Sequence, residues 1–298
     1  MNILSLEHLT HSYTERQLFD DADFYLHEGD KVGVIGVNGT GKSTLLKIMA
    51  GLETPDEGQV IQASNLMIHY LPQNPEFSED DTVLQSVQNM VHHHANENEL
   101  IAAKAMLTRL GITDFEQKTR ELSGGQRKRL ALVSVLITPC DVLILDEPTN
   151  HLDSEMADWL ENKLQAFRGA LVMVTHDRYF LDSVTNKIIE LDKGKIYSYD
   201  EKYSGFLQRK AEREESARAS ERKRQSILRK EIEWISRGAR ARSTKQKAHI
   251  QRYETLKNQK APEVDEKLQL SSISSRMGKT TIEIENVSKA YGENTLIC

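Results

Sequence analysis

Two spacings of apolar residues divide the first part of the chain into predicted strands and helices. Short apolar runs bounded by turn residues predict strands at Leu4–Leu9, Phe24–Leu26 and Lys31–Ile35. The segment Ser43–Ala50 follows a glycine-rich loop and predicts a helix, and apolar residues at helical spacing continue through residues 79–121. This order of elements is typical of an α/β domain.

Strands and helices alternate again from Ser123 to about residue 200. The apolar runs Val142–Leu145 and Ala170–Val174 predict buried strands of a parallel sheet, and two short strands are expected around Gly194. A helical segment at about residues 79–138 interrupts the alternation. We therefore expect a parallel α/β sheet that carries a helical insertion.

Composition narrows the class of protein without naming a function. Hydrophobic residues make up 38% and charged residues 28% of the 298 residues, as in ordinary soluble globular proteins. No apolar run approaches the roughly 18 residues needed to cross a bilayer, and the opening MNILSLEHLT lacks a secretory-signal pattern. Cys140 and Cys298 are too few for a disulfide framework, and Cys140 is expected to be a buried thiol. We expect a cytoplasmic protein with no membrane insertion.

The composition changes at about residue 203. Between Leu207 and Lys260 there are 17 Lys or Arg against 7 Glu, although the whole chain has a net charge of −6. Charge of both signs with few apolar residues predicts long, solvated helices. A turn at Arg237-Gly238-Ala239 would divide them into an antiparallel pair, the first roughly 28 residues and about 40 Å long. A polar spacer, Ser271–Met277, follows, so residues 203–277 are read as an interdomain linker.

The last segment of the chain repeats the first at an offset of 278 residues. Leu6-Glu7-His8-Leu9 corresponds to Ile284-Glu285-Asn286-Val287, and Tyr13, Glu15 and Leu18 correspond to Tyr291, Glu293 and Leu296. We expect residues 1–202 to form one domain and residues 278–298 to be the first strand of a second, truncated copy. The sequence then represents a fragment of a tandem protein or a natural truncation.

A phosphate-binding loop is predicted directly after the third strand. Residues Gly36, Val37, Asn38, Gly39, Thr40, Gly41, Lys42 and Ser43 match the pattern G-x-x-x-x-G-K-[ST]. Its glycines let backbone N–H groups surround phosphate oxygens, and the following helix directs its positive N-terminal end at the same anion. Lys42 reaches the β and γ phosphates, the Ser43 hydroxyl ligates Mg²⁺, and Thr44 lies beside them. The loop therefore predicts a site for the triphosphate of a nucleotide.

A pair of carboxylates ends the buried strand Val142–Leu145. Asp146 and Glu147 are expected at the carboxyl ends of the strands, where ligands bind in open α/β sheets. Acid pairs also end strands without a catalytic role, so the pair alone leaves both readings open. Beside a phosphate loop, the pair predicts that Asp146 holds Mg²⁺ through its water shell. Glu147 then polarises the water that attacks the γ phosphate.

A third motif, Leu122-Ser123-Gly124-Gly125-Gln126, opens a predicted helix. It closely resembles the signature of the ATP-binding cassette (ABC) family, and the resemblance covers about residues 1–200. The resemblance implies a P-loop NTPase core with an antiparallel β subdomain and a helical subdomain, followed by an α-helical hairpin linker. It also implies that Ser123, Gly124, Gly125 and Gln126 contact the γ phosphate held by an opposite cassette, in a head-to-tail sandwich of two ATP molecules. The simpler interpretation of this segment, the capped start of a helix, is compatible with that role.

The family resemblance implies roles for four further positions. Tyr13 resembles the aromatic residue that stacks on adenine, with a buried structural tyrosine as the alternative. Gln73 resembles the glutamine that senses Mg²⁺, and Asp153 lies in a segment that resembles the loop crossing to the partner cassette. His176 resembles the switch histidine that contacts the γ phosphate and orders the attacking water. The implied cofactors are ATP and Mg²⁺, with Ser43, Gln73 and Asp146 as metal ligands and Glu147 and His176 as catalytic residues.

Two longer stretches, Glu147–Asp153 and Thr175–Asp182, resemble the ABC-F subfamily, as does a charged helical linker between two cassettes. Members of that subfamily act on the ribosome as translation factors or as antibiotic-resistance factors, and the resemblance leaves both open. It implies that the linker enters the tRNA exit region and contacts P-site tRNA or ribosomal RNA, which its positive charge favours. A solvated structural spacer is the alternative. The stretch between Gln73 and Ser123 is short for the extra helical arm of some members.

Two other functions remain as alternatives. An ATPase subunit of a membrane transporter would need a separate membrane subunit, and a nucleic-acid-binding module would hold ATP only as a structural ligand. The main reading expects two partners: a second cassette, in the same chain or in a homodimer of the fragment, and the ribosome with its rRNA and tRNA. His92–His94 are read as a solvated helix face instead of a metal site, and Trp234 as packing between linker helices instead of stacking on a base.

Overall fold

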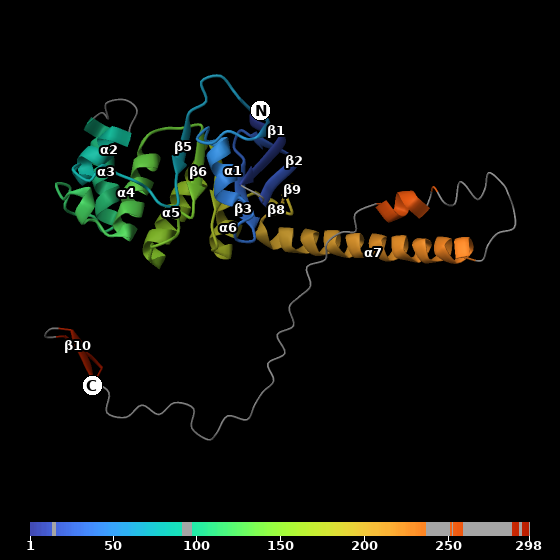
Figure 1. The fold of residues 1–298 in the computed structure, drawn as a ribbon. Coiled ribbons are helices and arrows are strands. Elements are labelled where there is room, and N and C mark those ends of the chain that lie inside the picture. Colours follow the sequence, from blue (N-terminus) through green and yellow to red (C-terminus); the bar gives the residue numbers. More distant parts are fainter. Residues whose placement is uncertain are drawn as a thin grey trace. The chain divides into compact units, whose positions relative to one another are not determined.

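The computed structural model describes residues 1–13, 16–90, 97–236, 251, 253–258, 288–291 and 294–297. The chain divides into two compact units, Met1–Ser216 and Ala217–Cys298, and each is described by itself. The first unit contains two sheets with helices around them (Figure 1). Among the residues described, none of the helices combines the length and apolar character of a membrane-spanning segment.

An antiparallel sheet of three strands begins the first unit. It consists of β1 (Asn2–Tyr13), β2 (Arg16–His27) and β4 (Glu57–Gln62), in the order β2-β1-β4. Strands β1 and β2 are 12 residues each, longer than the apolar runs that predict them, because register shifts along the pair absorb the irregular positions. The side chains of β4 are mostly exposed, so no apolar pattern predicts it. The sheet confirms the expected antiparallel β subdomain.

A second sheet of six strands carries the predicted motifs. Its strands are β5 (Ile68–Leu71), β6 (Val142–Asp146), β7 (Ala170–Val174), β3 (Lys31–Gly36), β8 (Lys187–Asp192) and β9 (Lys195–Tyr199), in that spatial order. Neighbouring strands are parallel, except that β9 runs antiparallel to β8. The expected parallel sheet is confirmed, and the two short strands around Gly194 are the hairpin β8–β9.

Alternate residues of the central strands enter two separate hydrophobic cores. Val142 and Ile144 of β6 pack in the core shared with the antiparallel sheet and helix α1 (Lys42–Met49). Leu143 and Leu145 pack in the core shared with the other helices. A strand whose alternate residues enter different cores is buried on both faces, as parallel strands usually are. The central sheet therefore lies between two packed layers.

Helices cover the sheet and form the insertion. Besides α1 they are α2 (Val83–Met90), α3 (Glu97–Arg109), α4 (Gly124–Ile137), α5 (Ser154–Ala166) and α6 (Arg178–Val184). Helices α2, α3 and α4 contact one another and account for the helical insertion expected at about residues 79–138. The histidines His92–His94 lie outside the described residues.

Helix α7 (Tyr203–Ser236) begins where the composition changes and runs for 34 residues. At about 1.5 Å per residue it is about 50 Å long, longer than the sequence pattern predicts. Its first turns pack on the hairpin β8–β9, where the ring of buried Phe206 lies 5.1 Å from that of Tyr199. Buried Glu190 of β8 accepts from Nζ of Lys210 at 2.5 Å and pairs with Nη2 of Arg213 at 2.9 Å. The base of α7 is therefore fixed to the sheet that carries the phosphate loop.

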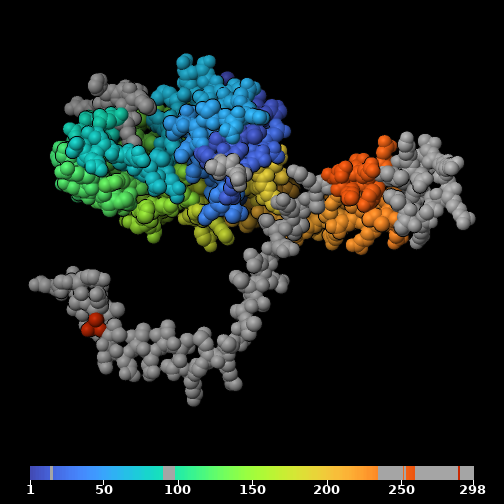
Figure 2. Space-filling model, in the orientation of Figure 1, coloured from blue at the N-terminus to red at the C-terminus, as the bar shows by residue number. Residues whose placement is uncertain are grey.

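The second unit contains the later turns of α7 and short segments after it. Most side chains of α7 beyond Ser216 are exposed (Figure 2). Nη1 of Arg224 donates to the carbonyl of Leu256 at 2.6 Å, so the helical residues 253–258 lie beside α7, as a hairpin linker requires. Helix α7 ends directly before the predicted turn at 237–239. That turn, the spacer 271–277 and the side chain of Trp234 lie outside the described part of the chain.

A short hairpin near the C-terminus repeats the pairing of the first hairpin. Strands β10 (Lys289–Tyr291) and β11 (Asn294–Ile297) pair Lys289 with Ile297, Ala290 with Thr295, and Tyr291 with Asn294. At the offset of 278 residues these are the pairs His11–Phe19, Ser12–Gln17 and Tyr13–Arg16, with a register shift at the same place. The repeat in sequence is therefore also a repeat in strand pairing.

We predict that Glu190→Ala lowers the free energy of unfolding by about 1–3 kcal/mol, because Lys210 and Arg213 lose their buried partner. The loss stays below that of a wholly buried pair, since both cations are partly exposed. Chemical denaturation measures it, with limited proteolysis of α7 as a second readout. The control Glu212→Ala removes an exposed pair with Arg209 and should cost less than about 0.5 kcal/mol. Equal costs would show that Glu190 does not fix the base of α7.

Candidate functional site

The loop between β3 and α1 is compact enough to require glycine at two positions. A Cβ at Gly36 would come within 2.6 Å of Thr40 Oγ1 and 2.9 Å of the carbonyl oxygen of Leu191. Gly41, directly before α1, has a φ of 94°, in the left-handed region that glycine tolerates. A tight loop that leads into a helix N-terminus is suited to bind an anion.

Lys42 supplies the positive charge at this loop. Its Nζ donates to the carbonyl of Gly36 at 2.9 Å and to that of Val37 at 3.3 Å. Burial lowers the pKa of Lys42 from its usual value, and the carboxylates of Glu147 and Asp146 oppose that shift. The ammonium therefore lies between the loop and the acid pair, in a position to neutralise an anionic ligand.

Two buried carboxylates lie at the end of β6. Asp146 is 1% exposed and Glu147 is 4% exposed. Glu147 also has a left-handed φ of 52°, which is strained for a residue with a Cβ. Within the described residues, Oδ2 of Asp146 and Oε2 of Glu147 have no hydrogen-bond partner. Buried carboxylate oxygens without partners are costly, so this pair fits a divalent cation and a bound water.

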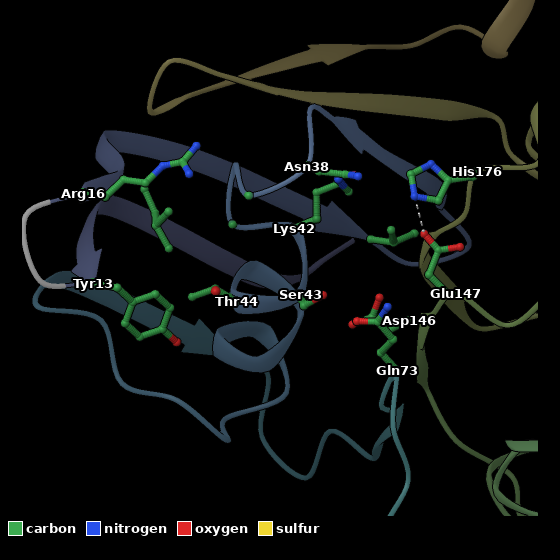
Figure 3. A pocket seen from close by; sticks show the side chains of 14 residues that line it. Tyr13, Arg16, Asn38, Lys42, Ser43, Thr44, Gln73, Asp146, Glu147 and His176 are labelled. Carbon is green, nitrogen blue, oxygen red and sulfur yellow. Dashed lines mark ion pairs between the residues drawn. The ribbon is translucent and has the colours of Figure 1, made fainter. Parts of the chain in front are cut away.

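His176 follows β7 and faces the acid pair. Its Nε2 lies 3.3 Å from Oε1 of Glu147, and its side chain is 68% exposed (Figure 3). The hydroxyls of Thr149 and Thr175 are 2.8 Å apart, which ties the segment after β6 to the segment after β7. This contact keeps the histidine beside the glutamate, where it can orient a water molecule.

Tyr13, at the end of β1, lies at the opposite end of the site. It is 47% exposed, which excludes the alternative of a buried structural tyrosine. Its hydroxyl donates to Oε1 of Glu53, and the same oxygen lies 3.1 Å from Nε2 of buried His11. The hydrogen bond to Glu53 raises the pKa of Tyr13 from its usual value. Polar contacts thus hold the Tyr13 ring through its hydroxyl, at the edge of the ring, as stacking on a planar base requires.

These segments surround a cavity of about 630 Å³, a size typical of cofactor sites. Figure 3 shows Tyr13 at one end, the Glu147–His176 pair at the other, and Lys42 between them. The predicted site residues that line the cavity are Tyr13, Asn38, Gly39, Gly41, Lys42, Ser43, Thr44, Gln73, Asp146, Glu147 and His176. Gly36, Val37 and Thr40 belong to the same loop but do not line the cavity.

Three residues of the cavity wall, Arg16, Leu18 and Val174, are not predicted by the sequence pattern. Nη1 of Arg16 would lie 2.9 Å from a Cβ at Gly39, so this side chain reaches over the phosphate loop. The available signal is its position opposite Tyr13 across the β1–β2 turn. Leu18 and Val174 supply apolar walls, and nothing in the sequence separates them from core residues.

The signature-like segment lies outside the cavity. Oγ of Ser123 accepts the N–H of Gln126 at 3.3 Å, and Oε1 of Gln126 accepts the N–H of Ser123 at 2.9 Å, so the pair caps α4. A Cβ at Gly125 would lie 3.2 Å from that of His151, two residues before Asp153, whose side chain caps α5. Besides Gly36, Val37 and Thr40, the predicted site residues absent from the cavity wall are Ser123, Gly124, Gly125, Gln126 and Asp153. Their contact with nucleotide stays a prediction that involves a second cassette.

Two family models match the chain, and both describe ABC transporter proteins. One covers residues 19–150, with the phosphate loop and the acid pair, and the other covers residues 189–271, with α7. The chain belongs to the ABC ATPase family. The family resemblance of the three motifs is therefore confirmed, and the matched residues include most of those that line the cavity.

Curated relatives place the chain among ABC-F proteins. It is 43% identical over 334 residues to the uncharacterized ABC transporter ATP-binding protein YfmR of Bacillus subtilis, covering 100% of this chain and 53% of that protein. It is 35% identical over 322 residues to the energy-dependent translational throttle protein EttA of Haemophilus influenzae, covering 95% and 58%. EttA is an ABC-F protein, which confirms the resemblance to that subfamily. The chain spans little more than half the length of these relatives.

Solved structures share the fold. An ATP-binding subunit of an ABC transporter aligns with a TM-score of 0.59 at 20% identity, covering 66% of this chain and 89% of that chain. An ATP-binding cassette solved as a dimer in a post-hydrolysis state, with ADP and phosphate, aligns with a TM-score of 0.58 at 24% identity, covering 66% and 98%. The ABC ATPase fold class expected from the sequence is confirmed.

We predict that Tyr13→Ala weakens ATP binding by about tenfold or more, because stacking on a base is worth about 1–3 kcal/mol. Tyr13→Phe keeps the ring and should stay within about threefold of the unmodified chain, since it removes only contacts of the hydroxyl, such as those with Glu53 and Thr44. Displacement of trinitrophenyl-ATP measures both affinities. Tyr25→Ala, at an exposed tyrosine of β2 that does not line the cavity, is the control. Full affinity in Tyr13→Ala would contradict the stacking role.

Proposed function

We propose that this chain is an ATP-binding cassette and linker of a cytoplasmic protein that uses ATP binding and hydrolysis to associate with the ribosome and to leave it. The observation that carries the proposal is that one sheet holds both the proposed nucleotide cavity and the base of a basic helix. Strand β3 leads into the phosphate loop, and its neighbour β8 holds the base of α7 through Glu190. The relatives named for a translational throttle support the ribosome as the target.

In this proposal Mg²⁺-ATP extends along the cavity from Tyr13 to His176. Tyr13 stacks on adenine, the loop holds the phosphates, and Lys42 neutralises the β and γ phosphates. The residues that hold Mg²⁺ are Ser43, Gln73 and Asp146. When bound, Mg²⁺ neutralises charge on the transferring phosphoryl group. The oxygen donors of these residues and the unpartnered Oδ2 of Asp146 support the assignment.

Glu147 and His176 carry the hydrolytic step of the proposal. Oε2 of Glu147 is buried without a partner, while Oε1 faces Nε2 of His176 at 3.3 Å. The carboxylate accepts a hydrogen bond from the attacking water, and His176 directs that water at the γ phosphate. The strained backbone at Glu147 holds its carboxylate in this position.

Full activity in this proposal needs a second cassette. Ser123 and Gly125 lie outside the cavity, and in this proposal they contact the nucleotide of an opposite cassette. The hairpin β10–β11, with the strand pairing of β1–β2, supports a second cassette in the same protein. We therefore expect the isolated chain to bind ATP and to hydrolyse it slowly.

Contact with ribosomal RNA or tRNA is assigned to α7. Arg222, Lys223, Arg229 and Lys230 are exposed on its later turns. Cations in this arrangement bind phosphates and release counterions, which makes binding depend on salt. The transport alternative does not predict an exposed basic helix of this length, so α7 favours the ribosome over that alternative.

We predict that Glu147→Gln in the tandem-cassette protein lowers ATP turnover by about 10²–10⁴-fold while ATP binding is kept, because the water loses its hydrogen-bond acceptor. Phosphate release measures turnover, and displacement of trinitrophenyl-ATP measures binding. The matched control is Glu155→Gln, an exposed acid in the first turn of α5. Unchanged turnover in Glu147→Gln would contradict the catalytic role of Glu147, whereas ATP binding without turnover in the unmodified protein would support the binding-module alternative.

We predict that the tandem-cassette protein with Glu147→Gln, and the same change in its second cassette, co-sediments with ribosomes in ATP but not in ADP. Replacing Arg222, Lys223 and Arg229 by Gln should weaken this association. It should also reduce the slope of affinity against salt concentration by the amount expected for the loss of up to about three phosphate contacts.

The control for the linker variant is Lys47→Gln, Lys163→Gln and Arg168→Gln, which removes the same charge from exposed positions of the first unit. This control should sediment like the parent protein. Loss of association in the control alone, or no ATP-dependent association in the parent, would count against the ribosomal assignment.

A further inference from the structure

Lys128 is a buried cation on α4, the helix that begins at the signature-like segment. It is 4% exposed, and its Nζ donates to the carbonyls of Pro72 at 2.6 Å, Gln73 at 3.1 Å and Asp146 at 2.6 Å. These bonds use all three donors of the ammonium group. Burial lowers the pKa of Lys128 to about 8, against the opposing effect of the carboxylates of Asp146 and Glu147.

Packing alone does not account for a lysine at this position. Burying an ammonium group costs several kcal/mol before its partners compensate, and an aliphatic side chain would avoid that cost. All three partners are backbone oxygens, so the contacts fix the path of the chain and leave the side chains of Gln73 and Asp146 to point elsewhere. Figure 3 shows those two side chains beside each other in the cavity.

The segments that Lys128 joins are remote from one another in sequence. Gln73 follows β5 and Asp146 ends β6, which is the neighbour of β5 in the sheet. Lys128 lies two residues after Gln126, whose side chain completes the cap of α4. One ammonium group thus connects the signature helix to the backbone of two residues that carry oxygen ligands.

We propose that Lys128 is a positioning residue that holds Gln73 and Asp146 at the spacing needed to bind one Mg²⁺ ion, and that couples this spacing to the position of α4. The inference rests on the Mg²⁺-ATP site proposed above. It goes beyond that site because Lys128 lies outside the cavity wall and acts through the backbone of two residues that line it.

The direction in which a substitution of Lys128 changes Mg²⁺ binding distinguishes a positioning role from an effect of its charge. If Lys128 acted only through its charge, its removal would take a cation away from the Mg²⁺ site and tighten Mg²⁺ binding. If it only stabilised the fold, removal would lower the melting temperature and leave Mg²⁺ binding as it was. Positioning predicts the third result, weaker Mg²⁺ binding.

The test measures the factor by which saturating Mg²⁺ tightens binding of trinitrophenyl-ATP, relative to binding in EDTA. In Lys128→Met this factor should fall about tenfold, or reach one, the value at which Mg²⁺ has no effect on binding. A loss of about this size is typical when groups that orient metal ligands are removed. Affinity in EDTA should stay within about threefold, because the phosphate loop is untouched. The control Arg129→Met removes a half-buried cation of the same helix that contacts Met156 instead, and should leave the factor unchanged.

A double-mutant cycle shows whether Lys128 acts through Gln73. In a Gln73→Ala background, Lys128→Met should lower the Mg²⁺ factor much less than it does alone, since the ligand it positions is absent. Additive effects of the two substitutions would overturn this route. If Lys128→Met does not fold, Lys128→Gln carries the test, because two N–H donors remain and the factor should fall to an intermediate value.

Three outcomes overturn the inference: an unchanged factor in Lys128→Met, a larger factor, or an equal fall in Arg129→Met. Each of these leaves the proposed nucleotide site in place, provided that the unmodified chain binds the probe and responds to Mg²⁺. Absence of probe binding in the unmodified chain overturns the nucleotide site itself. Binding without any response to Mg²⁺ overturns the metal site and the role of Lys128 together.

Discussion

Parallel pairing of β7 with β3 on one side and β6 on the other is the constraint on which the site depends. Val174 lies opposite both Val34 and Asp146, so the segments that follow these three strands emerge at one edge of the sheet. Because each strand is buried on both faces, its register is strongly specified. A slip by one residue in β6 would exchange the side chains of Leu143 and Ile144 between the two cores.

The sequence predicts those parts of the site that are built from contiguous residues. The phosphate loop needs glycines at fixed spacing because its backbone turns sharply, and Gly36 and Gly41 show that need in the fold. Sequence patterns do not predict Arg16, which lines the cavity from the start of β2, or Glu53, which contacts Tyr13 from the segment after α1, because no spacing marks either residue. Strand β4 escapes prediction for a related reason: it is held by pairing with β1 and has no apolar face of its own.

A short packed route connects the nucleotide site to the linker. In β8, Glu190 lies opposite Ile35 of β3, and the carbonyl of the next residue, Leu191, lies against Gly36 of the phosphate loop. The carboxylate of Glu190 holds Arg213 of α7, whose guanidinium lies 3.8 Å from the ring centre of Tyr197. Direct contacts therefore run without interruption from the strand before the loop to the base of α7.

The repeated hairpin differs from β1–β2 at two positions that matter for the two-cassette protein proposed above. Tyr291 takes the place of Tyr13, but Lys289 replaces His11 and Asn294 replaces Arg16. His11 contacts the glutamate that holds Tyr13, and Arg16 reaches over Gly39 of the phosphate loop. Both differences thus fall on polar groups at or beside the cavity wall, while the tyrosine is kept. In the two-cassette protein proposed above, the two cassettes keep a tyrosine at this position and differ in the charged residues next to it in the strands, so their ATP sites are expected to differ in affinity and turnover.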